Sequence, residues 1–437
     1  MKRPPHLRAW LALLAAALLA ILLPMLLAAC ARSSSNEMRG PVVLRVWAMG
    51  REGEVVRELL ADFERGHPGI RVEVQQLPWT DAQQKLLTSF AGDVTPDLCQ
   101  LGNTWIAQFA ALGALAPLDD RVAHAGTVPP ADYFDGIWAA NRIGAQLYGV
   151  PWYVDTRLLF YRRDLLSQAG FDHPPADWQE WTRMLAALKR RSPDSYGVLL
   201  PLNEFEPLLA LALQQDTPLL RDGERYGNFR SPAFRRTLQY YIDIFRQGWA
   251  PRVTATQISN VWDEFAKGYF SFYITGPWNI GEFKRRLPAD KQDSWMTAPL
   301  PGLNGPGASS AGGSSLVVFE KSKHKDAAWQ VIDYLSQPAV QLRFYAMTGN
   351  LPPRRSAWQD ARLAKDPYAQ AFRDQLERAK SPPKVPEWER IATEMRLVTE
   401  ALVAGQLTVD QAVAELDART DRILEKRRWM LAKGGHP

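Results

Sequence analysis

The sequence predicts an α/β fold built as two lobes, each with a doubly wound sheet, joined by hinge segments. The chain has 437 residues, which is enough for two domains of about 100 to 200 residues each. Strand and helix patterns alternate through residues 41–113, an order typical of a parallel sheet covered by helices. Three segments rich in Gly and Pro, residues 148–155, 299–315 and 351–355, are candidate crossings between the lobes.

The first 29 residues are predicted to be a lipoprotein signal peptide. They combine a basic start, an apolar run and two small residues directly before Cys30. The sequence Leu-Ala-Ala-Cys at residues 27–30 resembles a bacterial lipobox, so Cys30 is expected to be acylated and to become the mature N-terminus. The alternative is an uncleaved membrane anchor. Under either interpretation the chain is exported to the periplasmic or cell-surface side and tethered to a membrane, with the Ser-rich residues 30–40 as a flexible linker.

Charge and cysteine content limit the classes of partner. The net charge is +5, but the signal peptide holds three basic and no acidic residues, which leaves 5 − 3 = +2 for the mature chain. So small a balance does not support nucleic-acid binding. Cys99 is the only cysteine after Cys30, so no disulfide is expected within the fold. Its place in an apolar strand predicts a buried, inert thiol.

The first lobe is predicted from three successive strand and helix patterns. The strands are expected at residues 41–47, 70–74 and 97–101. The helices are indicated by an apolar face at residues 55–63, a capping box of Thr80 and Gln83, and a cap at Asn103 or Thr104 before residues 105–112. In such sheets ligands bind beyond the carboxyl ends of the strands. Here that means residues 48–54, Trp79 and residues 100–105.

The rest of the chain follows the same α/β pattern without a visible repeat. Strands are predicted at residues 158–161, 196–200, 269–275 and 316–319. Helices are predicted at residues 162–169, 177–188, 232–245, 261–271 and 326–336, and from residue 386 onward. Three helix starts carry capping signals: Asp177 with Glu180, Ser231 before Pro232, and Thr408 with Gln411. No ligand chemistry is expected from the region after residue 386.

The stretch from residue 148 to residue 166 combines aromatic side chains with a carboxylate just before an apolar strand. Trp152 and Tyr153 offer flat apolar faces with polar handles, and Asp155 follows two residues later. A carbohydrate has the matching chemistry, because its ring has an apolar face and a rim of hydroxyls. The alternative is that Trp152 and Tyr153 are core residues and Asp155 is a turn residue.

Common catalytic and metal-binding motifs are missing from the sequence. There is no P-loop, no GxGxxG, no GxSxG, no HExxH and no CxxC. The six histidines have no metal-ligand spacing. Neither a cofactor nor a metal ion is therefore expected.

Several pieces, in one order, carry a family resemblance. They are FERGHPGIRVEV, WTDAQQKLLTSFAGDVTPDL, LYGVPWYVDTRLLFYRRDLL, FAKGYFSFYITGPWNIGEF, AGGSSLVVFEKSKHKDAAW and TGNLPPRR. From about Val42 to its end, the chain resembles the solute-binding proteins of ABC sugar importers, of the maltose- and trehalose-binding type. The resemblance implies a monomer that closes two lobes on a sugar and delivers it to the transmembrane subunits of a permease. It implies one lobe of residues 41–153 plus 311–352 and another of residues 154–310 plus 353–437.

The resemblance also implies which residues contact the sugar. By motif position these are Glu54, Gln100, Asn103, Trp152, Tyr153, Asp155, Gly276, Trp278, Gly312, Gly313, Ser314 and Arg354. Trp79, at a predicted strand end, is added as a ligand contact, with a place in the core as the alternative for both Trp79 and Trp105. The alternatives are a hinge salt bridge for Arg354 and a charge at a helix start for Glu54. The chain lacks an acidic residue near Gly102 and a Trp at Ser314 that this type tends to have, so the exact sugar stays open.

An enzyme is the rival interpretation. A lipid-anchored glycoside hydrolase would use two carboxylates such as Glu54 and Asp155, about 5 Å apart for retention or roughly 6.5 to 9.5 Å apart for inversion. One of the two would need an apolar pocket that raises its pKa. The polar, Gly-rich surroundings of both residues in the sequence favour the binding protein.

Overall fold

The computed structural model describes residues 40–433. The predicted signal peptide, the acylation site at Cys30 and all of the predicted linker except Gly40 lie outside these residues. Within the described part of the chain, no helix is both long and apolar enough to cross a membrane.

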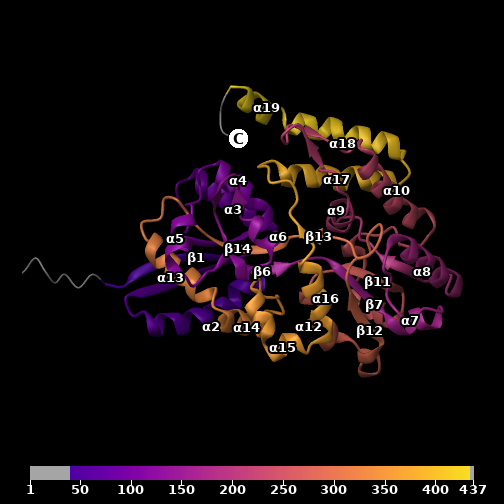
Figure 1. Cartoon of the computed structure of the whole chain (residues 1–437), viewed down its shortest axis with the longest axis horizontal. Coiled ribbons are helices and arrows are strands. Elements are labelled where there is room, and N and C mark those ends of the chain that lie inside the picture. The colour runs from indigo at the N-terminus through magenta and orange to yellow at the C-terminus, as the bar shows by residue number, and fades with distance from the viewer. Residues whose placement is uncertain (1–39, 434–437) are drawn as a thin grey trace, which may run out of the picture.

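A mixed five-stranded sheet forms the centre of the first lobe (Figure 1). Its strands, in spatial order, are β2 (Ile70–Leu77), β1 (Val42–Met49), β3 (Leu98–Gly102), β14 (Gly312–Val318) and β6 (Val150–Asp155). The first three strands are parallel, as expected. The sheet as a whole is mixed, because β14, which follows much later in the chain, runs antiparallel to both β3 and β6. It enters this lobe from the second one and so runs in the opposite direction.

A four-stranded mixed sheet forms the centre of the second lobe. Its strands, in spatial order, are β12 (Trp295–Ala298), β7 (Leu158–Arg162), β11 (Phe270–Thr275) and β8 (Tyr196–Leu199). Only β11 and β8 are parallel to each other. Two-stranded pairs complete the strands: β4 (Arg142–Ile143) with β5 (Gln146–Leu147), β9 (Leu220–Arg221) with β10 (Tyr226–Gly227), and β13 (Ser309–Ser310) with β15 (Ala379–Lys380).

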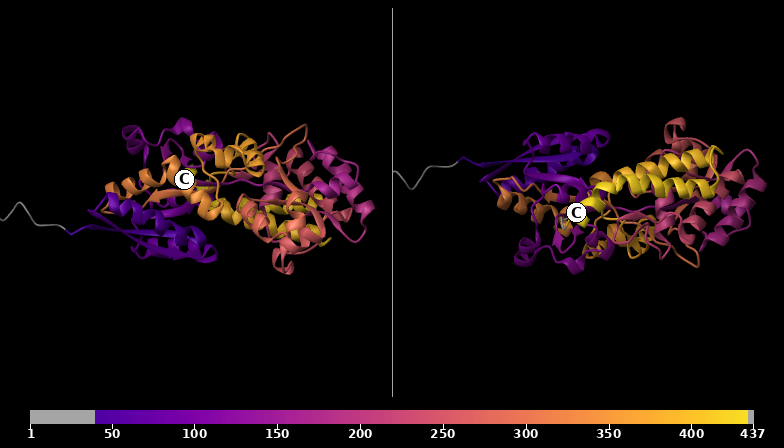
Figure 2. Two further views of the ribbon diagram at one scale, coloured as in Figure 1. Left: turned by 90° about the horizontal axis from the view of Figure 1, so that it is seen from below. Right: turned by 90° about the horizontal axis from the view of Figure 1, so that it is seen from above.

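Helices cover both sheets. Around the first sheet lie α2 (Gly50–Gly66), α3 (Trp79–Ala91), α4 (Ile106–Ala111), α5 (Asp119–Ala125), α6 (Asp135–Ala139), α13 (Lys325–Leu335) and α14 (Pro338–Thr348). Around the second lie α7 (Arg163–Gln168), α8 (Trp178–Arg191), α9 (Glu206–Leu213), α10 (Pro232–Arg246), α11 (Val261–Lys267), α12 (Trp278–Arg286), α15 (Ala361–Ala364) and α16 (Pro367–Leu376). The chain ends in α17 (Trp388–Val403), α18 (Val409–Ile423) and α19 (Glu425–Ala432), and Figure 2 shows the yellow α17 and α18 lying over the second lobe.

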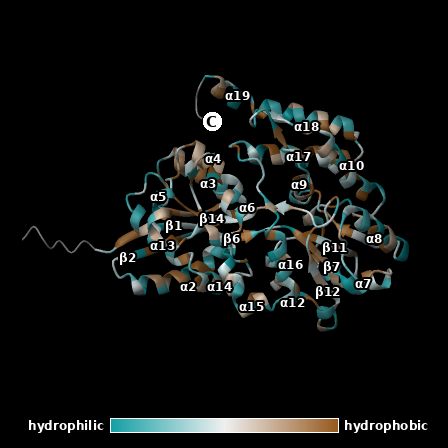
Figure 3. Ribbon diagram, viewed as in Figure 1, coloured by the Kyte–Doolittle hydropathy of each residue, from teal (hydrophilic) through white to brown (hydrophobic). Residues whose placement is uncertain are grey.

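Apolar side chains of the strands and of the inner helix faces form the cores. In Figure 3 the central strands carry most of the hydrophobic colour, and the outer helix faces are hydrophilic. Val56, Leu59 and Phe63 of α2 are buried in the core of the first lobe, because their spacing places them on one face of the helix. The C-terminal helices contribute to the core of the second lobe through residues such as Trp388 and Leu416.

The capping signals of three helices are confirmed. The Asp177 side chain accepts a hydrogen bond from the backbone N–H of Glu180 at 2.8 Å, and Ser231 caps α10 in the same way. Thr408 and Gln411 form a reciprocal capping box at the start of α18. Such caps satisfy backbone N–H groups that the helix itself leaves without partners.

Two other expected caps are wrong. The helix α3 begins at Trp79 after Pro78, and no side chain caps it, so Thr80 and Gln83 form no capping box. A short 3-10 helix, η1 (Asn103–Trp105), precedes α4, and it too begins without a side-chain cap. The Asn103 side chain makes hydrogen bonds with β14 instead.

The connections between the lobes run side by side. Only Thr156 and Arg157 separate β6 in the first sheet from β7 in the second. The strand β14 pairs with β6, and the backbone N–H of Val154 donates to Leu351 O at 2.9 Å. All three predicted crossings therefore meet at one place, between the two sheets. The strand β6 extends to Asp155, two residues beyond the lobe boundary expected at residue 153.

Candidate functional site

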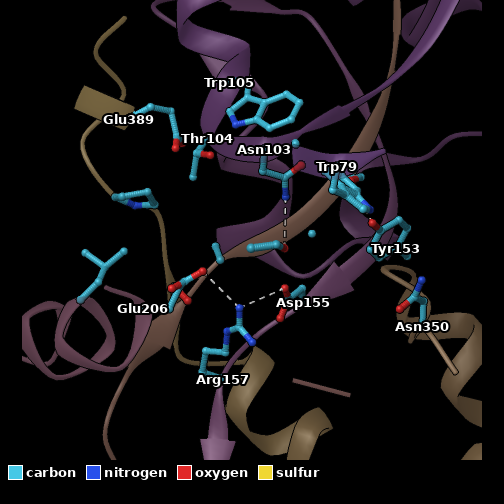
Figure 4. A pocket seen from close by; sticks show the side chains of 18 of the residues that line it. Trp79, Asn103, Thr104, Trp105, Tyr153, Asp155, Arg157, Glu206, Asn350 and Glu389 are labelled. Carbon is cyan, nitrogen blue, oxygen red and sulfur yellow. Dashed lines mark hydrogen bonds and ion pairs between the residues drawn. The ribbon is translucent and has the colours of Figure 1, made fainter. Parts of the chain in front are cut away.

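A cavity of about 490 Å³ lies between the two lobes. The first lobe lines it with Glu52, Trp79, Gly102, Asn103, Thr104, Trp105, Tyr153, Asp155, Gly312, Gly313 and Ser314. The second lobe and the connecting segments line it with Arg157, Phe205, Glu206, Leu209, Trp278, Ser310, Ala311, Asn350, Pro382 and Glu389. Figure 4 shows these side chains converging from segments far apart in the sequence. The cavity lies beyond the carboxyl ends of β1, β3 and β6, where the parallel-strand rule places a ligand.

A buried amide holds the floor of the cavity in place. Gln100 is fully buried, and its Oε1 accepts from the backbone N–H of Met49 at 2.7 Å. Its Nε2 donates to the Tyr153 hydroxyl at 3.1 Å and to Ser314 Oγ at 3.3 Å. The Ser314 and Tyr153 hydroxyls are also bonded to each other at 3.1 Å. Because these bonds join four strands, β1, β3, β6 and β14, Gln100 fixes Tyr153, although Gln100 does not itself line the cavity.

Close backbone packing at the start of β14 forms the next part of the wall. Asn103 Nδ2 donates to Gly312 O at 3.2 Å, and Asn103 Oδ1 accepts from Ser315 Oγ at 2.8 Å. A Cβ on Gly312 would lie 2.3 Å from Asp155 O, and one on Gly313 would lie 2.3 Å from Tyr153 O. Gly313 also has a φ of +113°, so both positions require glycine.

Charged groups cluster around Arg157 on the short connection between β6 and β7. Its guanidinium lies 3.8 Å from Asp155 and 3.4 Å from Glu206, and it sits 4.7 Å from the centre of the Trp278 ring. Burial raises the pKa of Asp155, and the charge of Arg157 offsets part of that rise. Burial is also the main reason that the pKa of nearby Glu204 rises to about 7. Carboxylates around one arginine can accept hydrogen bonds from hydroxyl groups.

Aromatic rings lie at several points of the cavity. Trp79 follows the end of β2, and its side chain is 37 % exposed. Its ring makes an edge contact with the Trp105 ring, with 5.6 Å between the ring centres. Trp278 begins α12, and a Cβ on Gly276 would lie 1.9 Å from the Trp278 ring. Gly276 does not line the cavity but leaves room for that ring. Such faces pack against apolar surfaces of a ligand.

The structure brings eight of the residues expected from the sequence together in the cavity. They are Trp79, Asn103, Tyr153, Asp155, Trp278, Gly312, Gly313 and Ser314. Their contact with a ligand remains a prediction, as it does for the five others: Glu54, Gln100, Trp152, Gly276 and Arg354. Gln100 and Gly276 lie behind the wall and support residues that line it.

The remaining three of those residues, Glu54, Trp152 and Arg354, have other partners. Arg354 Nε donates to Asp132 at 2.6 Å, and its Nη1 donates to two backbone carbonyls. Trp152 is buried and stacks on Phe344 at 4.4 Å between ring centres. Glu54 is exposed at the start of α2 and lies outside the cavity lining. The structure therefore does not bring Glu54 and Asp155 together in the cavity, where a hydrolase would need them.

Sequence reasoning missed several polar residues of the cavity. Arg157 and Glu206 had no motif to mark them, and Arg157 could have been found only from its place next to Asp155. Glu52 accepts from Asn350 Nδ2 at 2.7 Å, which connects the start of α2 to the segment after α14. Glu389 lies on α17, in the region from which no ligand chemistry was expected.

Comparison with known proteins agrees with this architecture. Residues 49–342 match the family model described as bacterial extracellular solute-binding protein. The structure resembles that of the sugar-binding protein MalE from the phytopathogen Xanthomonas citri, at 58% sequence identity and a TM-score of 0.87 over 90% of this chain and 99% of that one.

More distant proteins are similar to this chain in structure or in sequence. The GacH receptor of Streptomyces glaucescens, solved unliganded and with acarbose, superimposes at a TM-score of 0.76 and 24% identity over 88% of this chain and 99% of that one. The diacetylchitobiose binding protein DasA of Streptomyces coelicolor is 24% identical over 84% of this chain and 87% of its own length.

Proposed function

From its membership of the bacterial extracellular solute-binding protein family, we propose that the chain captures a small α-linked sugar. Members of this family bind substrates for ABC transporters and are not enzymes. Maltose, trehalose or a related oligosaccharide is the proposed ligand. A membrane permease of an ABC importer receives it. The single observation that carries the proposal is the cavity between the lobes, which is lined by both tryptophan rings and carboxylates.

The composition of the cavity supports a sugar. Trp79, Trp105 and Trp278 offer apolar faces to a sugar ring, and Asp155 and Glu206 offer charged acceptors to its hydroxyls. The relative from Xanthomonas citri is described as sugar-binding, which favours the same ligand class here. Neither the family nor the position of Glu54, outside the cavity lining, supports the hydrolase alternative.

Closure of the two lobes around the sugar is the proposed mechanism. The cavity has walls from both lobes, so a ligand that contacts both walls stabilises the closed state over the open one. The hinge is the bundle of side-by-side connections at Val154, Thr156 and Leu351. In the closed state the two lobes together form the surface that contacts the permease.

Membrane attachment completes the proposal. The family is extracellular, so the chain is exported. Acylation of Cys30 would hold the monomeric protein close to the permease, and residues 31–40 would give it reach.

Isothermal calorimetry tests the proposed ligand. The full chain, solubilised in a detergent without a sugar headgroup, is titrated with maltose, trehalose, sucrose, maltotriose and glucose. We expect one α-linked disaccharide or oligosaccharide to bind at micromolar affinity or tighter and to be recovered uncleaved. At about 100 times its dissociation constant it stabilises the fold by about 2.7 kcal/mol. Absence of binding by every sugar, or recovery of hydrolysed sugar, would contradict the proposal.

A further inference from the structure

Two buried acceptor atoms of the cavity wall lack hydrogen-bond partners. Among the described residues that line the cavity, only Asp155 Oδ1 and Glu389 Oε1 are buried side-chain oxygens without a partner. A buried acceptor left unsatisfied costs about 1 to 3 kcal/mol. A ligand with hydroxyl donors removes that cost when it reaches these atoms. Asp155 was expected from the sequence to contact a ligand, whereas no role was expected for Glu389.

The position of Glu389 follows from the way α17 packs. Its neighbour Trp388 is buried in the core of the second lobe. Successive residues of a helix point about 100° apart, so Glu389 turns away from that core and into the cavity (Figure 4). There it faces Thr104 of η1, from the other lobe, and the Thr104 hydroxyl offsets part of the rise in the pKa of Glu389 that burial causes.

Glu389 and Asp155 belong to one continuous site. The charge of Glu206 raises the pKa of both Asp155 and Glu389, so Glu206 interacts with each of them. In Figure 4 Glu389 lies with Thr104 and Trp105, and Asp155 lies apart from them, beside Arg157. A ligand that contacts both carboxylates therefore extends across the cavity.

The two carboxylates differ in their ionic partners. Arg157 forms ion pairs with Asp155 and Glu206. Within residues 40–433, no arginine, lysine or histidine forms an ion pair with Glu389. A neutral hydroxyl donor suits such a carboxylate, because it satisfies the buried oxygen without bringing a second charge into the cavity.

We propose that Glu389 is a ligand-binding residue that accepts a hydrogen bond from a second sugar ring, while Asp155 accepts one from the first. This inference rests on the proposed function and makes it more specific. The site selects saccharides of at least two rings, and its preference over a single ring depends on the C-terminal helix α17.

Affinity for a disaccharide relative to glucose tests the inference. The full-length wild type and the variants Glu389→Ala and Glu389→Gln are compared by calorimetry with the tightest disaccharide found and by ligand-observed NMR with glucose. Glu400→Ala is the matched control, because Glu400 lies on the same helix, pairs with Arg396 at 2.8 Å and does not line the cavity. Thermal unfolding of each unliganded protein is measured alongside.

We expect Glu389→Ala to weaken disaccharide binding at least about tenfold, the size of a lost hydrogen bond to a charged group. Glu389→Gln, which keeps a neutral acceptor, should lose less. Glucose binding should stay as in the wild type, and unliganded stability should not fall, because Glu389→Ala removes a buried oxygen without a partner. The inference is overturned by disaccharide affinity equal to wild type, by an equal loss for glucose, or by an equal loss in Glu400→Ala. If the wild type binds no sugar at all, the proposed function itself fails, and this inference fails with it.

Discussion

Within the part of the chain that the structure describes, Arg157 is the single cation near three carboxyl groups, those of Asp155, Glu204 and Glu206. Asp155 and Glu206 lie within 4 Å of its guanidinium, and the charge of Arg157 also lowers the pKa of Glu204. Three carboxylates therefore share one cation in a partly buried place. The cluster gains a favourable interaction when one carboxylate takes up a proton or when donors from a ligand arrive.

Glu204 should make folding stability depend on pH. Its pKa is raised from 4.5 to about 7, chiefly by burial, so the folded chain keeps a proton that the unfolded chain loses. The contribution of Glu204 to stability therefore falls as pH rises from about 4.5 to 7. Glu204→Gln should raise the unfolding temperature at pH 8 by about 2 °C and leave it nearly unchanged at pH 5.

Thermal unfolding at the two pH values measures this effect. The matched control is Glu73→Gln, an exposed glutamate of the first sheet. An equal gain for Glu204→Gln at pH 5 and pH 8 would contradict the assignment of the raised pKa to this residue.

Trp278 should be a main contact for the sugar ring. Its ring lines the cavity and rests against the Arg157 guanidinium, which holds it in one orientation. Trp278→Ala should weaken sugar binding by about 2 kcal/mol or more, on the scale of a lost aromatic anchor. Calorimetry measures the loss, and Trp429→Ala, at a position 58 % exposed on α19, is the control. Equal affinities for wild type and Trp278→Ala would remove Trp278 from the site.

The sequence revealed part of the site at the residue scale. Tyr153 and Asp155 could be found because aromatic residues and a carboxylate follow Gly149 and Pro151 just before a strand. Glu389 could not, since one acidic residue in the first turn of an amphipathic helix is ordinary. The motif made Arg354 a candidate ligand contact with a salt bridge as the alternative, and the fold identified Asp132 as its ion-pair partner.

The start of the strand β14 should be sensitive to substitution. The strand begins with Gly312 and Gly313, packed against the backbone of β6. Gly313→Ala should lower the free energy of unfolding by about 1 to 3 kcal/mol, because the new Cβ would meet Tyr153 O and the φ of +113° strains any other residue.

Denaturant unfolding measures that loss, and Gly405→Ala is its matched control. Gly405 also has a positive φ, of +78°, but no atom lies within 4 Å of its Cβ position. Backbone strain affects both variants, whereas the contact with β6 affects only Gly313→Ala. Equal losses in the two variants would show that close packing of β14 on β6 contributes nothing.

Three of the helix starts could be predicted, whereas sheet membership could not. Caps such as those at Ser231 and Thr408 could be found in the sequence because they depend on residues three positions apart. The direction and partners of β14 depend on contacts with Gln100 and Tyr153, which are distant in sequence. Local patterns contain no information on such pairing, so the parallel order of the first three strands could be predicted but the antiparallel position of β14 could not.

At the scale of the whole molecule, sugar binding should make the protein more compact. The walls of the cavity come from both lobes, and short connections such as Thr156 and Arg157 can act as a hinge. Small-angle X-ray scattering should therefore give a smaller radius of gyration with saturating disaccharide than without it. Trp278→Ala at the same sugar concentration should keep the larger radius. Identical curves for wild type with and without bound sugar would contradict hinge closure.

The interleaved order of the strands decides which of the two sheets a ribosome completes first. All four strands of the second sheet have been synthesised by residue 298, but β14, which lies between β3 and β6, ends only at residue 318. The lobe whose first strand comes earlier in the chain is therefore the lobe that completes its sheet later. A nascent chain of about 300 residues leaves β3 and β6 with unpaired edges, which invite wrong pairing. Such a chain is the form that a chaperone or a protease would meet.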